Sequence, residues 1–155
     1  MFSWTAFALS LLAVSASAAP PHLEARKGAA PVGGPASAKV TIYSSYTCPN
    51  GPGAAIPTDG SAGTALATFT IAEATCTIPP AGLLAGGAIT ATLLTTPKTG
   101  TVGCYILGHS QQGCGITLTN NLYGWPFNGI AVGNSVGCGS APTGTQWGAF
   151  EVLCV

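Results

Sequence analysis

Six cysteines, all between positions 48 and 154, constrain most strongly what this chain of 155 residues can fold into. An even number of cysteines in a small exported domain indicates disulfide bonds, which compensate for a small core. No two cysteines are adjacent or spaced as C-x-x-C, and His109 is the one histidine near them, so ligands for zinc or haem are scarce. We therefore expect three disulfides, which could form in any of fifteen connectivities. We expect the protein to bind neither a metal nor a cofactor.

The first 18 residues have the pattern of a secretory signal peptide. An apolar run is followed by small residues, with Ala16–Ala18 as an A-x-A cleavage pattern. Residues 19–37 are rich in Gly, Ala and Pro and contain the pair Arg26-Lys27, which indicates a pro-segment or disordered linker. Whether the basic pair is a processing site or part of a disordered tail stays open. We expect residues 38–155 to fold as one disulfide-rich β domain that is secreted to the extracellular space.

The chain carries four basic and four acidic side chains, so its formal net charge is zero. Proteins that bind nucleic acid or anionic membranes need clustered Lys and Arg, and we expect neither partner. No apolar stretch after the leader is long enough for a membrane span, which argues against stable membrane insertion. Hydrophobic residues make up 47% of the chain, which is enough for one core. We expect the protein to be a monomer.

Six segments alternate between apolar and polar residues with the period of two that is typical of half-buried strands. Thr, Val and Ile are frequent in them, Gly and Pro separate them, and helical patterns are nearly absent. The sequence therefore predicts an all-β fold, a compact disulfide-stapled β-sandwich of Greek-key type. The expected strands are residues 39–46, 65–71, 88–96, 102–108, 115–119 and 147–155.

Few side chains of the expected domain can act as an acid or a base. A Ser-His-Asp arrangement would need His109 and Asp59, but no G-x-S-x-G motif is present and Asp59 lies in a turn sequence. Paired carboxylates for glycoside cleavage would have to be Glu73 and Glu151, which we expect to face solvent. We expect His109 to be a polar turn residue between two strands. The sequence thus predicts a protein that is not an enzyme.

Three aromatic residues within a short stretch, Tyr123, Trp125 and Phe127, are the candidate binding residues. The glycine and the proline between them favour a loop. On a loop, the rings could stack on sugars, enter a membrane interface or contact a protein. The alternative is that they fold back and cover the core, which is favoured because a small domain needs its aromatic residues for burial. We expect the same packing role for Trp147.

Two segments of the chain repeat one pattern. Residues 40–48 and 104–114 each run from a strand into a small-polar turn with Ser and end in a cysteine, and Cys76 or Cys138 follows later. Together with residues 146–154, this pattern resembles the fungal small secreted cysteine-rich proteins that have a βγ-crystallin or killer-toxin-like double Greek key. The resemblance covers roughly residues 38–155.

The resemblance also implies which cysteines pair. If each half of the double Greek key closes its own turn, Cys104 and Cys154 remain to join the middle strand to the last. Each lies on the same strand face as apolar residues two positions away, so both thiols are expected to point into the core. The implied bridges are Cys48–Cys76, Cys114–Cys138 and Cys104–Cys154. Calcium binding is not implied, because the family's signature begins correctly at Asn120-Asn121 but lacks the hydroxyl residues at its end.

By resemblance, the protein acts outside the producing cell by binding, as a host-directed effector in virulence. One alternative is a killer-toxin-like antimicrobial protein, against which the zero net charge counts. Another is a cell-wall carbohydrate-binding protein, which would depend on Tyr123, Trp125 and Phe127. The expected partner is therefore an extracellular protein or a cell-wall glycan.

Overall fold

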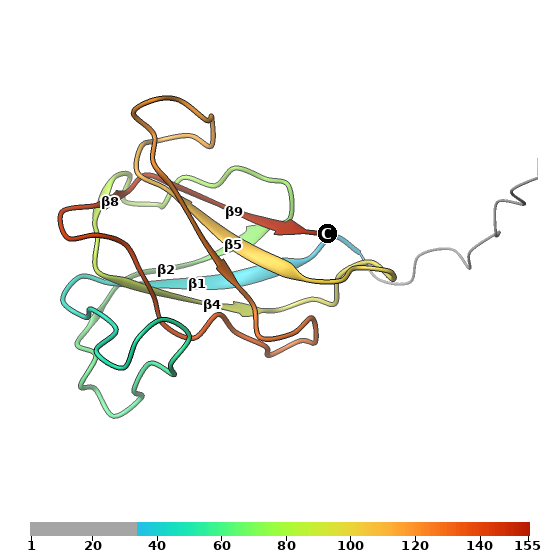
Figure 1. Ribbon diagram of the computed structural model, residues 1–155, viewed down its shortest axis with the longest axis horizontal. Helices are drawn as coiled ribbons and strands as arrows, with labels where there is room; N and C mark the ends of the chain where they lie inside the picture. The colour runs from blue at the N-terminus through green and yellow to red at the C-terminus, as the bar shows by residue number, and fades with distance from the viewer. Residues whose placement is uncertain (1–33) are drawn as a thin grey trace, which may run out of the picture.

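The computed structural model describes residues 34–155, and these residues form nine β-strands and no helix (Figure 1). The predicted signal peptide, residues 1–18, and most of the predicted pro-segment lie outside the described residues. The strands are β1 (Ser37–Tyr43), β2 (Ala65–Ala72), β3 (Leu84–Ala85), β4 (Ala88–Leu93), β5 (Cys104–His109), β6 (Leu122–Pro126), β7 (Gly139–Ser140), β8 (Gln146–Trp147) and β9 (Ala149–Cys154).

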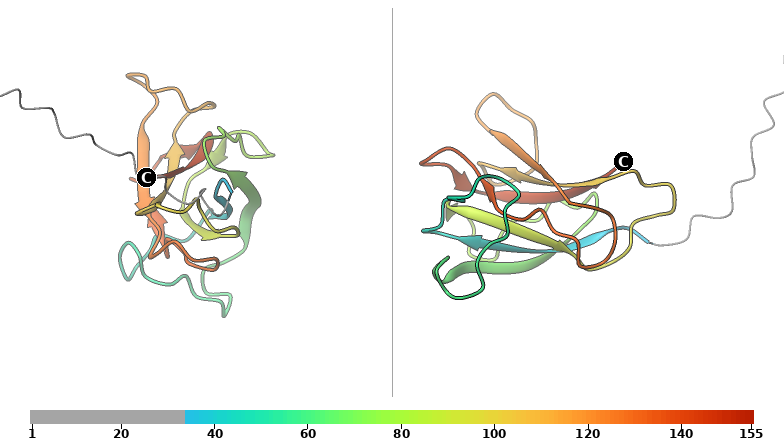
Figure 2. Two further views of the ribbon diagram at one scale, coloured as in Figure 1. Left: turned by 90° about the vertical axis from the view of Figure 1, so that its right-hand side faces the viewer. Right: turned by 60° about the horizontal axis from the view of Figure 1, so that its bottom comes forward.

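Two sheets of unequal size pack against each other. The four-stranded sheet has the order β2-β1-β4-β7, the three-stranded sheet has the order β6-β5-β9, and β3 pairs with β8 in a separate two-stranded sheet. Figures 1 and 2 show β5 and β9 lying over the layer formed by β1, β2 and β4. The predicted all-β, disulfide-stabilised fold is confirmed, whereas the Greek-key connection stays a prediction.

The inner faces of the two larger sheets form one hydrophobic core. Every second residue of β1 is fully buried, namely Ala38, Val40 and Ile42, as the period of two in a strand requires. The three-stranded sheet contributes Ile106 of β5 and Val152 of β9 from the opposite side. Burial stabilises the fold by roughly 1.5–3 kcal/mol for each side chain of Val or Ile size.

Aromatic rings continue this core toward one end of the sandwich. Phe69 of β2 lies 5.7 Å from Phe150 of β9, and Phe150 lies 5.6 Å from Trp147, measured between ring centroids. The Trp147 ring meets Trp125 at 5.6 Å and Tyr123 at 5.7 Å, edge to face in both cases. Trp147 is fully buried, so its predicted packing role is confirmed.

Two of the three disulfides differ from the predicted pairing. Cys104 pairs with Cys154 as expected, because the two cysteines are register partners on β5 and β9. The other bridges are Cys48–Cys138 and Cys76–Cys114. The expected bridges Cys48–Cys76 and Cys114–Cys138 are therefore wrong. The two observed bridges link the two halves of the repeat instead of closing each half.

Strand pairing explains why Cys48 meets Cys138. The N–H of Ala88, the first residue of β4, donates to the carbonyl oxygen of Tyr46 at 2.7 Å, which holds the segment before Cys48 beside β4. Strand β7 begins directly after Cys138 and pairs with the same end of β4. Both cysteines are thus brought to the start of one strand, although they are 90 residues apart in the sequence.

The same reasoning applies to Cys76 and Cys114, which meet beside Phe150 of β9. Thr77 exchanges two backbone hydrogen bonds with Phe150, both of 2.8 Å, so Cys76 lies next to β9. The sulfur of Cys114 lies 3.9 Å from the carbonyl oxygen of Phe150. This arrangement depends on long-range pairing that no local pattern in the sequence reveals.

Three local expectations also need correction. Residues 115–119, predicted as a strand, lie in a loop, whereas the expected aromatic loop contains strand β6. Strand β6 is an edge strand that pairs only with β5, and an edge position tolerates Pro126, which has no N–H to donate. Ala36, predicted to belong to the linker, is fully buried, and β1 begins at Ser37.

Candidate ligand-binding groove

A groove of about 920 Å³ lies where the end of β5 and the beginnings of β6 and β8 come together. Most of its lining residues carry a hydroxyl or an amide group, and none of them is charged. Its size is at the upper end of the range for small-molecule sites. The lining residues are Leu83, Ser110, Gln111, Gln112, Thr119, Asn121, Tyr123, Pro142, Thr143, Gly144, Thr145 and Gln146.

Asn120 organises the first wall of the groove, which residues 110–112 form. Its side-chain oxygen accepts the N–H of Gln111 at 2.9 Å, and its side-chain nitrogen donates to the carbonyl groups of Gly113 and Gly115 at 3.0 and 2.8 Å. The Asn120 side chain is buried, so these three bonds are protected from water. One amide therefore fixes the shape of the loop of residues 110–121.

Gly148 holds the first wall close to the sheet. Its N–H donates to the carbonyl oxygen of His109 at 2.8 Å. A Cβ atom at this position would lie only 2.1–2.5 Å from backbone atoms of Gln111 and Gln112, which no real side chain tolerates. Glycine is therefore required for residues 111 and 112 to lie against the junction of β8 and β9.

A tight turn forms the second wall, residues 142–146. The N–H and the hydroxyl group of Thr145 both donate to the carbonyl oxygen of Pro142, at 3.1 and 2.7 Å. Gly144 adopts a φ of 87°, a conformation that favours glycine. Gln146 then begins β8 and pairs with Ala85 of β3, which anchors the turn to the fold.

Tyr123 is the aromatic residue of the groove. It is half-buried, and its ring rests against Trp147 and Trp125 at the end of the core. Trp125 and Phe127 are only 9% and 7% exposed and belong to the core, which is the alternative that the sequence favoured. Of the three aromatic residues, Tyr123 is the one that lines the groove, and a contact between it and a ligand stays a prediction.

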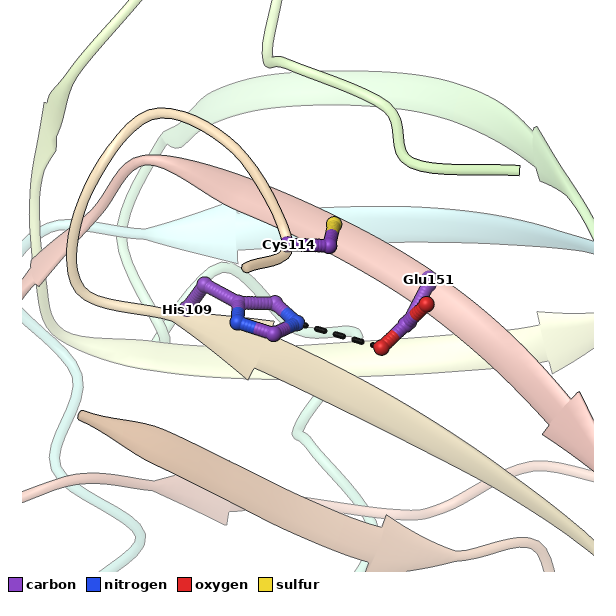
Figure 3. Close-up of side chains that lie close together, drawn as sticks. All are labelled: His109, Cys114 and Glu151. Carbon is purple, nitrogen blue, oxygen red and sulfur yellow. Dashed lines mark hydrogen bonds and ion pairs between the residues drawn. The ribbon is translucent and has the colours of Figure 1, made fainter. Parts of the chain in front are cut away.

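His109 and Glu151, weighed separately in the sequence as candidate acid-base residues, lie together in the structure (Figure 3). The Nε2 atom of His109 lies 3.2 Å from Oε1 of Glu151. His109 is 1% exposed, so the expected polar turn residue is instead a buried residue at the end of β5. Its Nδ1 atom has no hydrogen-bond partner among the described residues, and no nucleophile is therefore placed against it.

The other two acidic side chains of residues 34–155, Glu73 and Asp59, have other partners. Glu73 accepts the backbone N–H of Ala36 at 2.7 Å, so it ties the start of β1 to the end of β2. Asp59 accepts hydrogen bonds from the hydroxyl group and the N–H of Ser61, and these hold the pKa of Asp59 below its ordinary value. The turn predicted at Asp59 is present, and His109 has Glu151 rather than Asp59 as its carboxylate partner.

A second, smaller hollow of about 490 Å³ lies against the four-stranded sheet, between Thr90 and Thr92 of β4 and the loop of residues 55–63. Its lining contains hydroxyl groups and Tyr43 but no side-chain amide. The groove at residues 110–112 therefore offers more hydrogen-bonding groups, and the smaller hollow serves as an internal comparison.

Sequence reasoning did not single out the polar residues of the groove. Gln111, Gln112 and Gln146 are the three glutamines of the chain, and two of them follow a strand while the third begins one. Their clustering depends on the position of the residue 142–146 turn beside the residue 110–112 loop. The one signal in the sequence was that all of the chain's glutamines lie near strand ends.

Comparisons with known proteins assign the chain to no family. No family model matches it, and no curated protein and no solved structure matches it either. In residues 34–155, no helix is long and apolar enough to cross a membrane.

Proposed function

We propose that this is a secreted, non-enzymatic protein that binds a neutral glycan in the groove. The observation that carries the proposal is the uncharged lining, in which amide and hydroxyl groups surround one aromatic ring. Sugar hydroxyl groups both donate and accept hydrogen bonds, and amide side chains can answer both roles. A phosphate or carboxylate ligand would instead be expected to meet Arg or Lys, and neither lines the groove.

The individual groups suit this ligand class. Gln111, Gln112 and Gln146 have exposed side chains, and no hydrogen bond within residues 34–155 occupies their amides. Tyr123 offers a ring that packing against Trp147 already holds in place, so little side-chain entropy is lost when a ligand binds. An aromatic ring can pack against the apolar C–H face of a sugar.

Two further observations support secretion and a non-enzymatic role. The three disulfides within one chain are consistent with an oxidising, extracellular environment. His109 is the histidine within residues 34–155. It is buried and does not line the groove. A glycan in the groove would therefore meet hydrogen-bonding groups and not an acid-base pair.

Retention on insoluble polysaccharides tests the proposal. The protein is expected to bind chitin or β-glucan, and Tyr123→Leu is expected to weaken retention at least tenfold, since it removes the ring but keeps an apolar side chain. Tyr123→Phe keeps the ring and should stay within about threefold of the wild type. Tyr105→Leu is the matched control, because Tyr105 is exposed on β5 outside the groove.

Two results would contradict the proposal. One is the absence of retention on every neutral polysaccharide. The other is equal retention of the wild type and Tyr123→Leu, with both variants shown to be folded by their near-UV circular dichroism. A loss in Tyr105→Leu of the same size as in Tyr123→Leu would show that the effect does not come from the groove.

The second candidate function is the protein contact that a host-directed effector needs. Ile116 and Leu118, two positions apart in the residue 110–121 loop, are 86% and 104% exposed. Exposed apolar side chains that lie close together favour protein contacts. The double variant Ile116→Ser, Leu118→Ser is expected to abolish cross-linking to host surface proteins while glycan retention is unchanged. Unchanged cross-linking would contradict this function.

A further inference from the structure

Three side chains of different chemistry converge where the residue 110–121 loop meets β5 and β9 (Figure 3). His109 comes from β5, Glu151 from β9 and Cys114 from the loop, and one nitrogen, oxygen or sulfur atom of each lies within 4.8 Å of the others. Imidazole nitrogen, carboxylate oxygen and thiolate sulfur are the three atom types with which proteins bind zinc. The cluster is distinct from the groove, because none of the three residues lines it.

The separations are close to those of a zinc site. Zinc binds imidazole nitrogen and carboxylate oxygen at about 2.0–2.2 Å and thiolate sulfur at about 2.3 Å, so ligands at tetrahedral angles lie roughly 3.3–3.7 Å apart. The Nε2 atom of His109 and Oε1 of Glu151 are 3.2 Å apart. The sulfur of Cys114 lies within 4.8 Å of both atoms, so a displacement of roughly 1 Å would bring it within the range of a zinc site.

Cys114 is in a disulfide with Cys76 and therefore has no thiolate to offer. This disulfide differs from the other two in its exposure. Cys76 is exposed and Cys114 is half-buried, whereas Cys48, Cys138 and Cys104 are all buried. We therefore expect a reductant in solution to reach Cys76–Cys114 first, because each of the other bridges contains at least one buried cysteine.

We propose that the Cys76–Cys114 disulfide covers a latent zinc site, in which His109, Glu151, Cys114 and Cys76 become the ligands after reduction. A small-molecule thiolate attacks the sulfur of Cys76, the S–S bond breaks and Cys114 leaves as a thiolate. A second small thiol then releases Cys76, so that two external thiols are oxidised to one disulfide as the protein gains two electrons. Zn²⁺ takes the place of the thiol protons and completes a closed four-ligand set.

Zinc content after controlled reduction tests the proposal. The full chain is recovered oxidised from a secreting host and treated with a phosphine, which becomes phosphine oxide with the oxygen of water as the disulfide becomes two thiols. Alkylation and peptide mass mapping then identify the reduced cysteines, and elemental analysis after gel filtration gives the bound zinc. The expected result is reduction of Cys76–Cys114 alone, with one zinc per reduced chain and none per oxidised chain.

Variants distinguish zinc bound at this four-ligand site from zinc bound adventitiously by the free thiols. Glu151→Gln removes one ligand charge while keeping the side-chain size, and it is expected to weaken zinc binding by the reduced chain at least tenfold. Glu73→Gln is the matched control, because Glu73 is a carboxylate whose partner is the backbone of Ala36, and it should leave zinc affinity unchanged. Cys76→Ala frees the Cys114 thiol without any reductant and should bind zinc more weakly than the reduced wild type.

Each contrary result would overturn the proposal. Reduced protein without zinc, or zinc bound equally by the wild type and Glu151→Gln, would show that the cluster is not a site. Simultaneous reduction of all three disulfides, or loss of the near-UV circular dichroism on reduction, would show that the folded reduced state does not exist. Failure of Cys76→Ala to bind zinc while it remains folded would give the same conclusion independently of the reductant.

Discussion

The two faces of the three-stranded sheet are stabilised in different ways. Its inner face carries fully buried apolar residues such as Ile106, Phe150 and Val152, which pack against the four-stranded sheet. Its outer face carries Glu151 and the buried His109 close to Cys114 of the residue 110–121 loop, whereas Tyr105 and Leu153 of the same face are exposed. The hydrogen bonds of Asn120 and the Cys76–Cys114 disulfide hold that loop in place. Apolar burial therefore determines the fold, whereas a few polar contacts determine the shape of the groove and the cluster.

This comparison predicts that the largest loss of stability follows a change on the inner face. Phe150→Ala removes a ring that contacts both Phe69 and Trp147 in a fully buried position, and it is expected to lower the free energy of unfolding by about 3–5 kcal/mol. Urea denaturation followed by tryptophan fluorescence measures the change. Leu118→Ala in the exposed loop is the control and should stay within about 0.5 kcal/mol. Equal losses would contradict the comparison.

A smaller loss is expected from the residue that organises the outer loop. Asn120→Ala leaves the N–H of Gln111 and two carbonyl groups without their partner, which should cost about 2 kcal/mol. Hydrogen exchange should accelerate in residues 110–121 and stay slow in β1 and β4, because those strands belong to the other sheet. Uniform acceleration across the chain would show that loop and core unfold as one unit.

The smallest change in stability, about 1–2 kcal/mol, is expected at the contact between loop and sheet. Gly148→Ala places a Cβ atom against the backbone of Gln111 and Gln112, and the loop must move outward to relieve it. Glycan retention should fall more than stability does, since residues 111 and 112 line the groove. Gly103→Ala is the control, because its Cβ would meet nothing within 4 Å. If Gly148→Ala retains glycan as well as the wild type does, the contact between residue 148 and the loop is not needed for binding.

The sequence predicted the inner face well. Alternating apolar residues located β1, β2, β4, β5 and β9, because a strand with one buried face must show a period of two. The Cys104–Cys154 bridge, which the resemblance implied and with which the same alternation is compatible, is present. Strand β6 was missed because its proline is tolerated at a sheet edge, and edge position is a property of the assembled sheet.

The outer face could not be predicted in the same way. The Cys76–Cys114 bridge and the His109–Glu151 contact join residues that 38 and 42 positions separate, and only strand pairing brings them together. The Cys48–Cys138 bridge beside the four-stranded sheet, whose cysteines are 90 positions apart, was missed for the same reason. Similarly, His109 was expected to be a polar turn residue between two strands, but it ends β5 and is buried. Polar contacts between distant segments leave no periodic pattern in a sequence.

Amide chemical-shift mapping with soluble chitin or β-glucan oligosaccharides tests the central claim, that the groove binds a neutral glycan, most directly. The account predicts saturable shifts in residues 110–112, 119–123 and 142–146, with a small response in the inner strands β1 and β4. Absence of shifts at saturating oligosaccharide would contradict it. Shifts confined to residues 55–63, Thr90 and Thr92 would also contradict it, because they would place the ligand in the smaller hollow.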